Sequence, residues 1–377
     1  VYGVSRRYLE ECVQSVFSQT YGNWQLCLVD DCFADAELRS LLEEYGEHER
    51  VKVHFRAERG HISRATNDAI AMADGEFVAF LDCDDTLAPN ALFAIAEKLN
   101  ENPACDLIYS DEDKLNDAGT VVHTPFFKPE WSPDTLLSLM YTCHLSTYRT
   151  SLVREVGGIR VGVEGAQDYD LALRVTERTD RIAHIPKVLY HWRQRRGSSA
   201  YSAHEKPYIF EATMKVKRDA LERRGLRGEV EYLKDSSLFQ VFYHPDEDSR
   251  VSIIIPSKDN FAVFKTCVES IAAHAGMLPY EGIVVDNGST PENRSKYEAL
   301  CEKHGFRYHY EPMVFNFSRS CNIGAGLAPV NLPLVPNDDT EPSHDTWLER
   351  MAGQAPSPHA GAVGGKPPYP RGRVTQP

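Results

Sequence analysis

Over the first part of the chain, stretches with the apolar spacing of a helix alternate with short apolar runs typical of strands. In three stretches apolar residues recur at the spacing of an amphipathic helix, and short runs of aliphatic residues lie between them. The pattern predicts helices over 8–19, 36–45 and 63–72, and strands over 25–29, 51–55 and 77–81. Because helices and strands alternate along the chain, we predict an α/β fold with a largely parallel sheet.

The same pattern occurs a second time further along the chain. The matching segments are 12–15 with 267–270, 63–67 with 318–322, and Asp84 with Asp339. All of them lie at one common spacing, which unrelated amphipathic segments do not readily produce. The sequence therefore predicts a duplicated domain.

The repeat also sets the expected domain organisation. We predict a first domain at 1–228, a linker at 229–250, and the N-terminal half of a second domain at 251–377. The second domain opens with 251–256, an apolar run typical of a buried parallel strand, whose counterpart would precede Val1. We therefore expect both copies to be incomplete parts of a longer protein. Without its opening strand, the first copy is expected to be weakened or inactive.

Composition and charge narrow the function classes. Hydrophobic residues make up 42% and charged residues 25% of the 377 residues, which excludes a disordered chain. The net charge of -14 argues against a nucleic-acid partner, because phosphates would be repelled, but not against a nucleotide ligand. The 9 cysteines are scattered and form no CxxC pair, which favours a reducing compartment over a zinc ribbon. We expect a cytoplasmic protein, with peripheral membrane association left open.

Carboxylates follow two of the predicted strands at their carboxyl ends, where open α/β sheets bind ligands. Asp30 and Asp31 follow the first predicted strand, and Asp82 and Asp84, spaced as D-x-D, follow the third. Such a pair holds a hard divalent cation when a diphosphate supplies further oxygen ligands. Aspartates at strand ends also form turns and cap helices, and this interpretation stays open for an isolated D-x-D.

The segment 80–87 also fits the D-x-D-x-T motif of haloacid-dehalogenase-like phosphatases. In that chemistry Asp82 would attack phosphorus and Asp84 would move the proton. The motif expects a downstream acidic segment led by Gly-Asp, which the sequence lacks, and two predicted strands precede it here. The repeat has Asn337 in place of the nucleophile. A phosphatase is the less favoured alternative.

Two motifs further along add candidate residues. Asp168 lies in QDYDLALR, at the start of a predicted helix, and His191 and Arg193 lie in VLYHWR. An aspartate at a helix start also serves as a cap, and a histidine beside a tryptophan is often structural. Taken singly, each motif favours the structural interpretation.

Taken together, the motifs are more specific. The series VDD, R-x-x-N, LDxDD, YSDEDK, FKPEWSPD, QDYDLALR and IPKVLYHWR resembles family 2 glycosyltransferases of the GT-A fold. The resemblance is greatest to multidomain bacterial enzymes that build O-antigen or rhamnan-type surface polysaccharides. It extends into the second copy through VSIIIP, VVDNGST, FNFSRSCN, NDDT and GAVGGK. It implies a duplicated Rossmann-like fold in the cytoplasm, at or near the inner membrane.

The resemblance also implies an activity. A sugar would move from a UDP, dTDP or GDP donor to a hydroxyl of a glycan or lipid-linked acceptor, with inversion, and Asp168 would be the general base. The donor would be bound by Asp30, Asp31, Arg64, Asn67, Asp82 and Arg193. Mn²⁺ or Mg²⁺ would be held by Asp84 and His191. In the second copy, Asp286 and Asp339 would take the nucleotide and metal positions.

Two departures from the family pattern affect these expectations. Cys32 and Phe33 stand where the family usually has Gly-Ser, so the tight turn there is in doubt. Gln167 stands before Asp168 in place of the commoner Glu, which removes a neighbouring charge. A module that binds a sugar nucleotide without catalysis remains an alternative, beside the phosphatase.

Overall fold

A computed structural model describes residues 1–195, 207–233, 238–329, 332–356 and 360–365. The chain divides into two compact units. Unit 1 comprises Val1–Gly225 and Val230–Val241, and unit 2 comprises Leu226–Glu229 and Phe242–Pro377. Among the described helices, none is long and apolar enough to cross a membrane.

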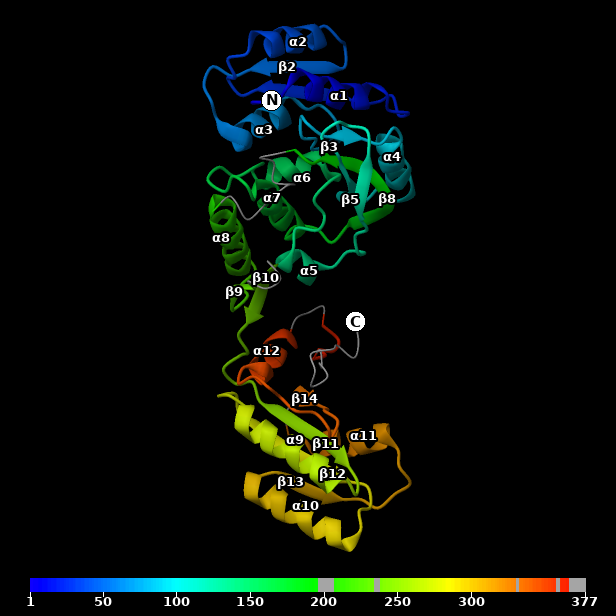
Figure 1. The fold of residues 1–377 in the computed structure, drawn as a ribbon, viewed down its shortest axis with the longest axis vertical. Helices are drawn as coiled ribbons and strands as arrows, with labels where there is room; N and C mark the ends of the chain where they lie inside the picture. The colour runs from blue at the N-terminus through cyan, green and yellow to red at the C-terminus, as the bar shows by residue number, and fades with distance from the viewer. Residues whose placement is uncertain (196–206, 234–237, 330–331, 357–359, 366–377) are drawn as a thin grey trace. The chain divides into compact units, whose positions relative to one another are not determined.

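Unit 1 begins with a small parallel sheet of two strands (Figure 1). Its elements are α1 (Arg6–Phe17), β1 (Leu26–Asp30), α2 (Ala36–Gly46), β2 (Val51–Phe55) and α3 (His61–Met72). Leu9 of α1 and Leu42 of α2, both 0% exposed, pack with Leu28 of β1 in one apolar cluster. Helix α3 contacts β1 and β2 and lies on the other side of them from α2 (Figure 1).

The rest of unit 1 is built on a six-stranded mixed sheet of order β3-β7-β5-β8-β4, with β6 paired to β5. The strands are β3 (Phe77–Ala79), β4 (Thr86–Leu87), β5 (Leu107–Leu115), β6 (Val122–Phe126), β7 (Ser146–Arg149) and β8 (Ile182–Arg193). The helices are α4 (Ala91–Glu101), α5 (Pro133–Ser138), α6 (Thr150–Glu155), α7 (Gln167–Thr176) and α8 (Pro207–Arg223). Strands β5 and β8 form a long parallel pair at the centre. A hairpin, β9 (Gly228–Leu233) and β10 (Leu238–Tyr243), follows α8.

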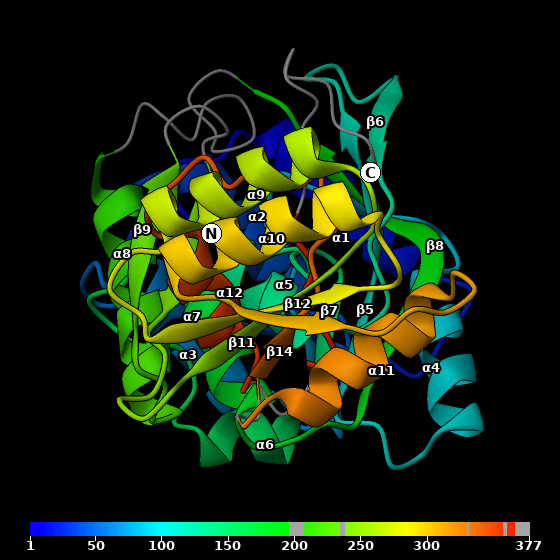
Figure 2. The same ribbon diagram turned by 90° about the horizontal axis from the view of Figure 1, so that it is seen from below.

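Unit 2 contains a four-stranded parallel sheet of order β13-β12-β11-β14. The strands are β11 (Val251–Ser257), β12 (Tyr280–Asp286), β13 (Arg307–Tyr310) and β14 (Leu332–Leu334). The helices are α9 (Phe261–His274), α10 (Pro291–His304), α11 (Phe317–Leu327) and α12 (Trp347–Gln354). Figure 2 shows α9 and α10 on one face of this sheet and α11 on the other. Every residue of β11 is buried, as expected for a central parallel strand.

The predicted elements of the first copy are all present, and the α/β class is confirmed. Small differences concern the ends: α3 begins at His61, and β3 ends at Ala79. The prediction of a largely parallel sheet is wrong for the six-stranded sheet, where β3, β4, β6 and β7 run antiparallel to their partners. The reason is that a buried apolar run has the same composition whichever direction its neighbour takes, so the pattern does not report strand direction.

Candidate active site

The acidic motif after β3 lies in a large cleft of unit 1. The cleft has a volume of about 2480 Å³, and residues of both sheets of this unit line it. The polar residues that concern the chemistry are Asp82, Glu112, Cys143, His144 and Asp168. The fold therefore gathers side chains that lie far apart in the sequence.

Asp85 is the most firmly held carboxylate of the motif. The backbone N–H of Asp85 donates to the carbonyl of Asp82 at 3.0 Å, which forms a tight turn directly after the strand. Its side chain is 1% exposed and accepts hydrogen bonds from Tyr190 Oη at 2.6 Å and from the Arg193 backbone N–H at 2.7 Å. Burial and the nearby Asp82 raise the pKa of Asp85 to about 8, although His144 opposes the shift.

His144 faces this turn from the loop before β7. Its ring stacks on Tyr190, with centroids 4.5 Å apart and an interplanar angle of 13°. One ligand atom each from Asp82, Asp85 and His144 lie within 4.8 Å of one another. Asp82 is exposed to the cleft, yet the surrounding protein limits its hydration and raises its pKa, while His144 acts in the opposite direction. Two carboxylates and an imidazole are a donor set suited to a divalent cation.

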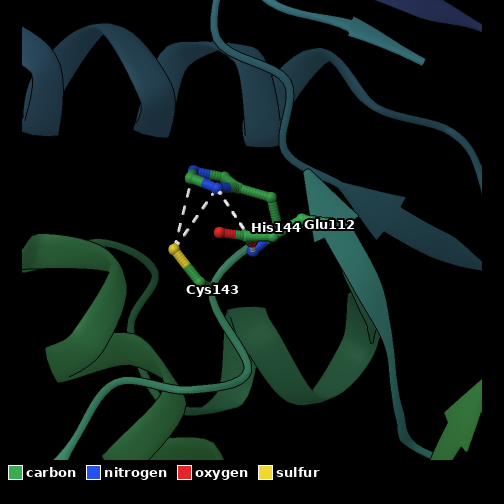
Figure 3. Close-up of side chains that lie close together, drawn as sticks. All are labelled: Glu112, Cys143 and His144. Carbon is green, nitrogen blue, oxygen red and sulfur yellow. Dashed lines mark hydrogen bonds and ion pairs between the residues drawn. The ribbon is translucent and has the colours of Figure 1, made fainter. Parts of the chain in front are cut away.

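Behind His144 lies a buried group of polar side chains. Figure 3 shows the His144 imidazole contacting both the Cys143 thiol, at 3.3 Å, and the Glu112 carboxylate, at 3.3 Å. Glu112 also accepts from Lys128 Nζ at 3.2 Å and from the His144 backbone N–H at 3.0 Å. Burial would raise the pKa of Glu112, but its partners His144 and Lys128 lower it to about 2.

The same contacts decide the protonation of His144. Burial disfavours the charged imidazole, yet Cys143 and Glu112 raise the pKa of His144 well above its ordinary value. A charged imidazole offers no lone pair to a metal. A cation that uses His144 as a ligand must therefore displace a proton from it.

Two arginines at the end of β8 and directly after it contact Asp84 in different ways. Arg195 Nε donates to the Asp84 carboxylate at 2.5 Å. Arg193 is 0% exposed: its Nε donates to the Asp84 backbone carbonyl at 2.6 Å, and its Nη2 pairs with Glu11 at 2.5 Å. The Arg193 guanidinium is thus used inside the protein, and Arg195 is the arginine at the Asp84 carboxylate.

His191 lies on β8 opposite β5, beside Asp113. Its Nδ1 is 2.6 Å from Asp113 Oδ1, and its side chain is 22% exposed. Among the described residues, the groups of three or more potential metal ligands include neither His191 nor Asp84. The predicted pair Asp84 and His191 remains a prediction. In the structure Asp84 pairs with Arg195 and His191 with Asp113.

Asp168 occupies the first turn of α7, as its motif predicts, and lines the cleft. Its side chain accepts from the Tyr169 backbone N–H at 2.8 Å. This hydrogen bond orients the Asp168 carboxylate at the first turn of the helix, at the cleft surface.

The predicted donor residues at the first strand are partly engaged in the fold. Asp31, which is 3% exposed, accepts from the Gly60 backbone N–H at 2.7 Å and pairs with Arg56 at 3.1 Å. Asp30 is buried, and its carboxylate accepts from the Phe33 backbone N–H at 3.4 Å. Both hydrogen bonds shape the loops around the end of β1.

The two predicted residues on α3 differ from each other. Arg64 is exposed and lines the cleft, so its guanidinium is available to a ligand. The Asn67 amide exchanges two hydrogen bonds with the backbone of Ile159, donating at 2.7 Å and accepting at 2.8 Å. In this structure Asn67 connects α3 to the segment before α7.

In unit 2 the two predicted residues also lie at strand ends. Asp286 closes β12, is 0% exposed, and accepts from the Gly288 and Ser289 backbone N–H groups at 3.0 and 2.8 Å. Tyr308 Oη donates to its second oxygen at 2.5 Å. Asp339 is exposed in the turn after β14.

Five residues of the site were not among those predicted from the sequence: Asp85, Glu112, Lys128, Cys143 and His144. Glu112 lies within the SDEDK motif, but nothing in its spacing indicates that it meets residues 16 and 32 positions away. Long-range contacts of this kind follow from the pairing of β5 with its neighbours, which the sequence pattern does not specify.

With this geometry in view, comparison with known proteins gives a family. The model of glycosyl transferase family 2 matches residues 1–157 and 252–376. The chain belongs to this family. The expected resemblance is thereby confirmed, and the family match agrees with the expected GT-A fold.

The chain spans less than half the length of the two relatives that match nearly all of it. It is 38% identical to protein y4gI of Sinorhizobium fredii, over 99% of the chain and 42% of that protein. It is 36% identical to the O-antigen biosynthesis protein RfbC of Myxococcus xanthus, over 99% of the chain and 29% of that protein. Among solved structures, S. aureus TarS 1-349 in complex with UDP-GlcNAc has a TM-score of 0.48 at 23% identity, covering 57% of the chain and 63% of TarS 1-349.

Proposed function

We propose that unit 1 transfers a sugar from a nucleotide-diphosphate donor to a hydroxyl of a glycan or lipid-linked acceptor, in the synthesis of a bacterial surface polysaccharide. The observation that carries the proposal is that Asp168 and Asp82 line the same cleft. Family membership supports sugar transfer. The name of the Myxococcus relative supports a role in polysaccharide synthesis.

In the proposed reaction the acceptor oxygen attacks the anomeric carbon from the side opposite the diphosphate, which inverts the configuration. The new bond joins the acceptor oxygen to that carbon, and the bond from the carbon to the diphosphate oxygen breaks. Asp168 takes the proton of the acceptor hydroxyl. Its position on the first turn of α7, where the Tyr169 backbone N–H orients the carboxylate at the cleft, supports this role.

We also propose a site for Mn²⁺ or Mg²⁺ in this cleft. The donor set of Asp82, Asp85 and His144 fits such an ion, since their ligand atoms already lie within 4.8 Å of one another. The family resemblance implies a different pair of metal ligands, Asp84 and His191. When bound, the ion would supply positive charge to the departing diphosphate. Two arginines, Arg195 beside Asp84 and the exposed Arg64, would also supply positive charge to the diphosphate.

The nucleotide is proposed to lie toward β1 and α3, along the cleft wall formed by Asp31 and Arg64. The Arg193 guanidinium is buried, so its proposed role is to hold the backbone of Asp84 and not to touch the donor. In unit 2, Asp286 and Asp339 are proposed to bind a nucleotide at most. Duplication of the domain is supported by the two separate segments that the family model matches.

The proposal is tested by incubating the chain with a panel of UDP-, dTDP- and GDP-sugars and Mn²⁺, and measuring released nucleoside diphosphate and donor affinity. The test variant is Asp168→Asn. The matched control is Asp134→Asn, which changes another first-turn carboxylate, in α5, that does not line the cleft.

Sugar transfer predicts that Asp168→Asn abolishes release while donor affinity is retained, and that Asp134→Asn changes neither. Release that survives in Asp168→Asn but is lost in Asp82→Asn would favour the phosphatase alternative. Donor binding without release, by the unchanged chain as well as by the variants, would favour a non-catalytic binding module.

A further inference from the structure

Cys143 belongs to a cluster of potential metal ligands that the proposed reaction does not use. Each of the 9 cysteines carries a free thiol. Among the described residues, Cys143 is the one cysteine that forms part of a group of three such ligands, together with Glu112 and His144. One ligand atom from each of the three lies within 4.8 Å of the other two. The cluster therefore combines a sulfur, a nitrogen and an oxygen ligand.

The spacing of the ligand atoms is close to that of a zinc site. Bonds to zinc of about 2.0–2.3 Å in a tetrahedral arrangement place neighbouring ligand atoms about 3.4–3.6 Å apart. His144 Nδ1 lies 3.3 Å from Cys143 Sγ and 3.3 Å from Glu112 Oε2 (Figure 3). A central ion would thus need only small movements of these side chains.

The surrounding residues hold the ligands in place before any ion binds. The His144 ring stacks on Tyr190, which is 0% exposed, and meets the edge of the Trp192 ring at a centroid distance of 5.0 Å. Glu112 is held by Lys128 Nζ and by the His144 backbone N–H. Groups around metal ligands commonly orient them in this way.

An ion can reach the cluster from the cleft. Glu112, Cys143 and His144 all line the cleft, and the His144 side chain is 16% exposed. Zinc sites with three protein ligands keep a water molecule in the fourth position. Here the cleft can supply that water.

The types of ligand distinguish zinc from the harder cations. Mg²⁺ and Mn²⁺ prefer oxygen ligands, whereas a thiolate with an imidazole favours zinc. A thiolate and a carboxylate together also carry two negative charges, which balance a divalent ion. Lys128 lies 3.2 Å from the same carboxylate and disfavours a cation, so the thiolate is needed as well as Glu112. When the ion binds, the protons of the thiol and of the imidazole pass to solvent.

We propose that Glu112, Cys143 and His144 form a zinc site in unit 1. Zn²⁺ is held by Cys143 Sγ, His144 Nδ1 and the Glu112 carboxylate, with a water molecule from the cleft as the fourth ligand. The ion joins β5, which carries Glu112, to the loop before β7, which carries the other two ligands. This inference depends neither on sugar transfer nor on the proposed Mn²⁺ or Mg²⁺ site, and its test needs no activity.

The test uses the full chain, freed of metal with a chelator, and Zn²⁺ alone as the ligand. Zinc affinity is measured by competition with a chromophoric chelator, and stoichiometry by elemental analysis. Co²⁺ then replaces Zn²⁺, because thiolate-bound Co²⁺ absorbs in the near ultraviolet by charge transfer from sulfur. A site made only of oxygen and nitrogen ligands, such as Asp82, Asp85 and His144, does not give this band.

The test variant is Cys143→Ser, which keeps the size of the side chain and removes the thiolate. The matched control is Cys83→Ser, because Cys83 is also half-buried and lines the same cleft. We expect one Zn²⁺ per chain and a cobalt–thiolate band in the unchanged protein. Cys143→Ser should weaken zinc binding by about 100-fold and abolish the band, while Cys83→Ser should change neither.

A second measurement needs no variant, so it holds even where Cys143→Ser fails to fold. Alkylation of individual thiols in the unchanged chain is followed by peptide mass spectrometry, with and without zinc. At a zinc concentration about ten times its Kd, roughly one chain in eleven is free, so alkylation of Cys143 should slow about tenfold. Alkylation of Cys83 should keep its rate.

Three results would overturn the proposal. The first is that micromolar zinc neither binds nor slows alkylation of Cys143. The second is zinc binding of equal affinity in Cys143→Ser and the unchanged chain, without a thiolate band, which would place the ion on oxygen ligands. The third is loss of the band in Cys83→Ser, with Cys83 protected by zinc, which would make Cys83 the sulfur ligand.

Discussion

Lys128 and Glu112 form an ion pair that unit 1 buries almost completely. Their side chains are 0% and 4% exposed, and Nζ lies 3.2 Å from Oε2. Lys128 Nζ also donates to the Thr142 carbonyl at 2.8 Å, so the pair secures the loop that carries His144. Burying two charges gives little net stability, but removing one of them leaves the other uncompensated.

Lys128→Met is therefore expected to lower the free energy of unfolding by about 3 kcal/mol. The double variant Lys128→Met, Glu112→Gln should lose clearly less than the two single losses added together. Urea unfolding followed by circular dichroism measures all of them. The control is Lys98→Met, which breaks an exposed pair of similar length, 3.0 Å, and should cost less than about 1 kcal/mol. Equal losses in Lys98→Met and Lys128→Met would contradict this account.

A second buried lysine makes the free energy of unfolding depend on pH. Lys217 of α8 is 0% exposed, and burial lowers its pKa to about 7. In the unfolded chain the lysine keeps its ordinary pKa of 10.5. Between pH 7 and 10.5 the unfolded state therefore binds one proton more than the folded state, so the free energy of unfolding rises with pH. We expect the free energy of unfolding to rise by up to about 1.4 kcal/mol per pH unit from pH 7.5 to 9 through this residue.

The variant Lys217→Met should lose this rise, and urea titrations at pH 7.5 and 9 measure it. Lys215→Met is the control, because Lys215 lies on the same helix and its side chain is 55% exposed. If Lys217→Met and the unchanged chain gain stability equally over this range, Lys217 is charged in the folded protein.

At the scale of elements, Asn67 joins α3 to the segment that leads into α7. Its amide both donates to and accepts from the Ile159 backbone, so aspartate would keep the acceptor and place a carboxylate against the Ile159 carbonyl. We expect Asn67→Asp to cost about 1–3 kcal/mol in urea unfolding. Asn322→Asp is the control, because Asn322 is the matching position in α11 and is exposed. A loss of donor affinity with unchanged stability would instead make Asn67 a donor-binding residue, as its motif predicts.

The elements themselves were predictable, and their partners were not. The strand over 25–29 and the helix over 36–45 follow from local periodicity, because each buries one face regardless of what covers it. The pairing of β3 with β7 joins segments about 70 residues apart, which no local pattern reports. The D-x-D turn was recognised for the same local reason, whereas His144 reaches it only through the arrangement of β7 beside β3.

Arg193 illustrates the same limit. Its motif predicts a cation near the carboxylates, and the residue is indeed beside Asp84. Its guanidinium, however, pairs with Glu11, which lies 182 positions away on α1. A side chain of this length has several possible partners, and only the fold decides between them.

At the scale of the whole molecule, two compact units with separate cores predict two unfolding transitions. Trp24, Trp131 and Trp192 lie in unit 1, and Trp347 lies in unit 2. Fluorescence of a Trp347→Phe variant should therefore follow unit 1 alone. We expect this fluorescence to report one transition and circular dichroism of the same variant to report two. A single transition that is the same by both measurements would mean that the units unfold together.

The central position of β11 has a consequence for synthesis on the ribosome. This strand is made first in its sheet, but its neighbour β14 is made roughly 80 residues later, which takes about 4–16 seconds at ordinary translation rates. During that time one edge of a strand that the folded protein buries completely has no partner. A nascent chain stalled before Leu332 should therefore bind chaperones more strongly than one stalled after β14 has emerged from the ribosome. The order of synthesis, and not only the final fold, thus determines when this protein is most exposed to misfolding.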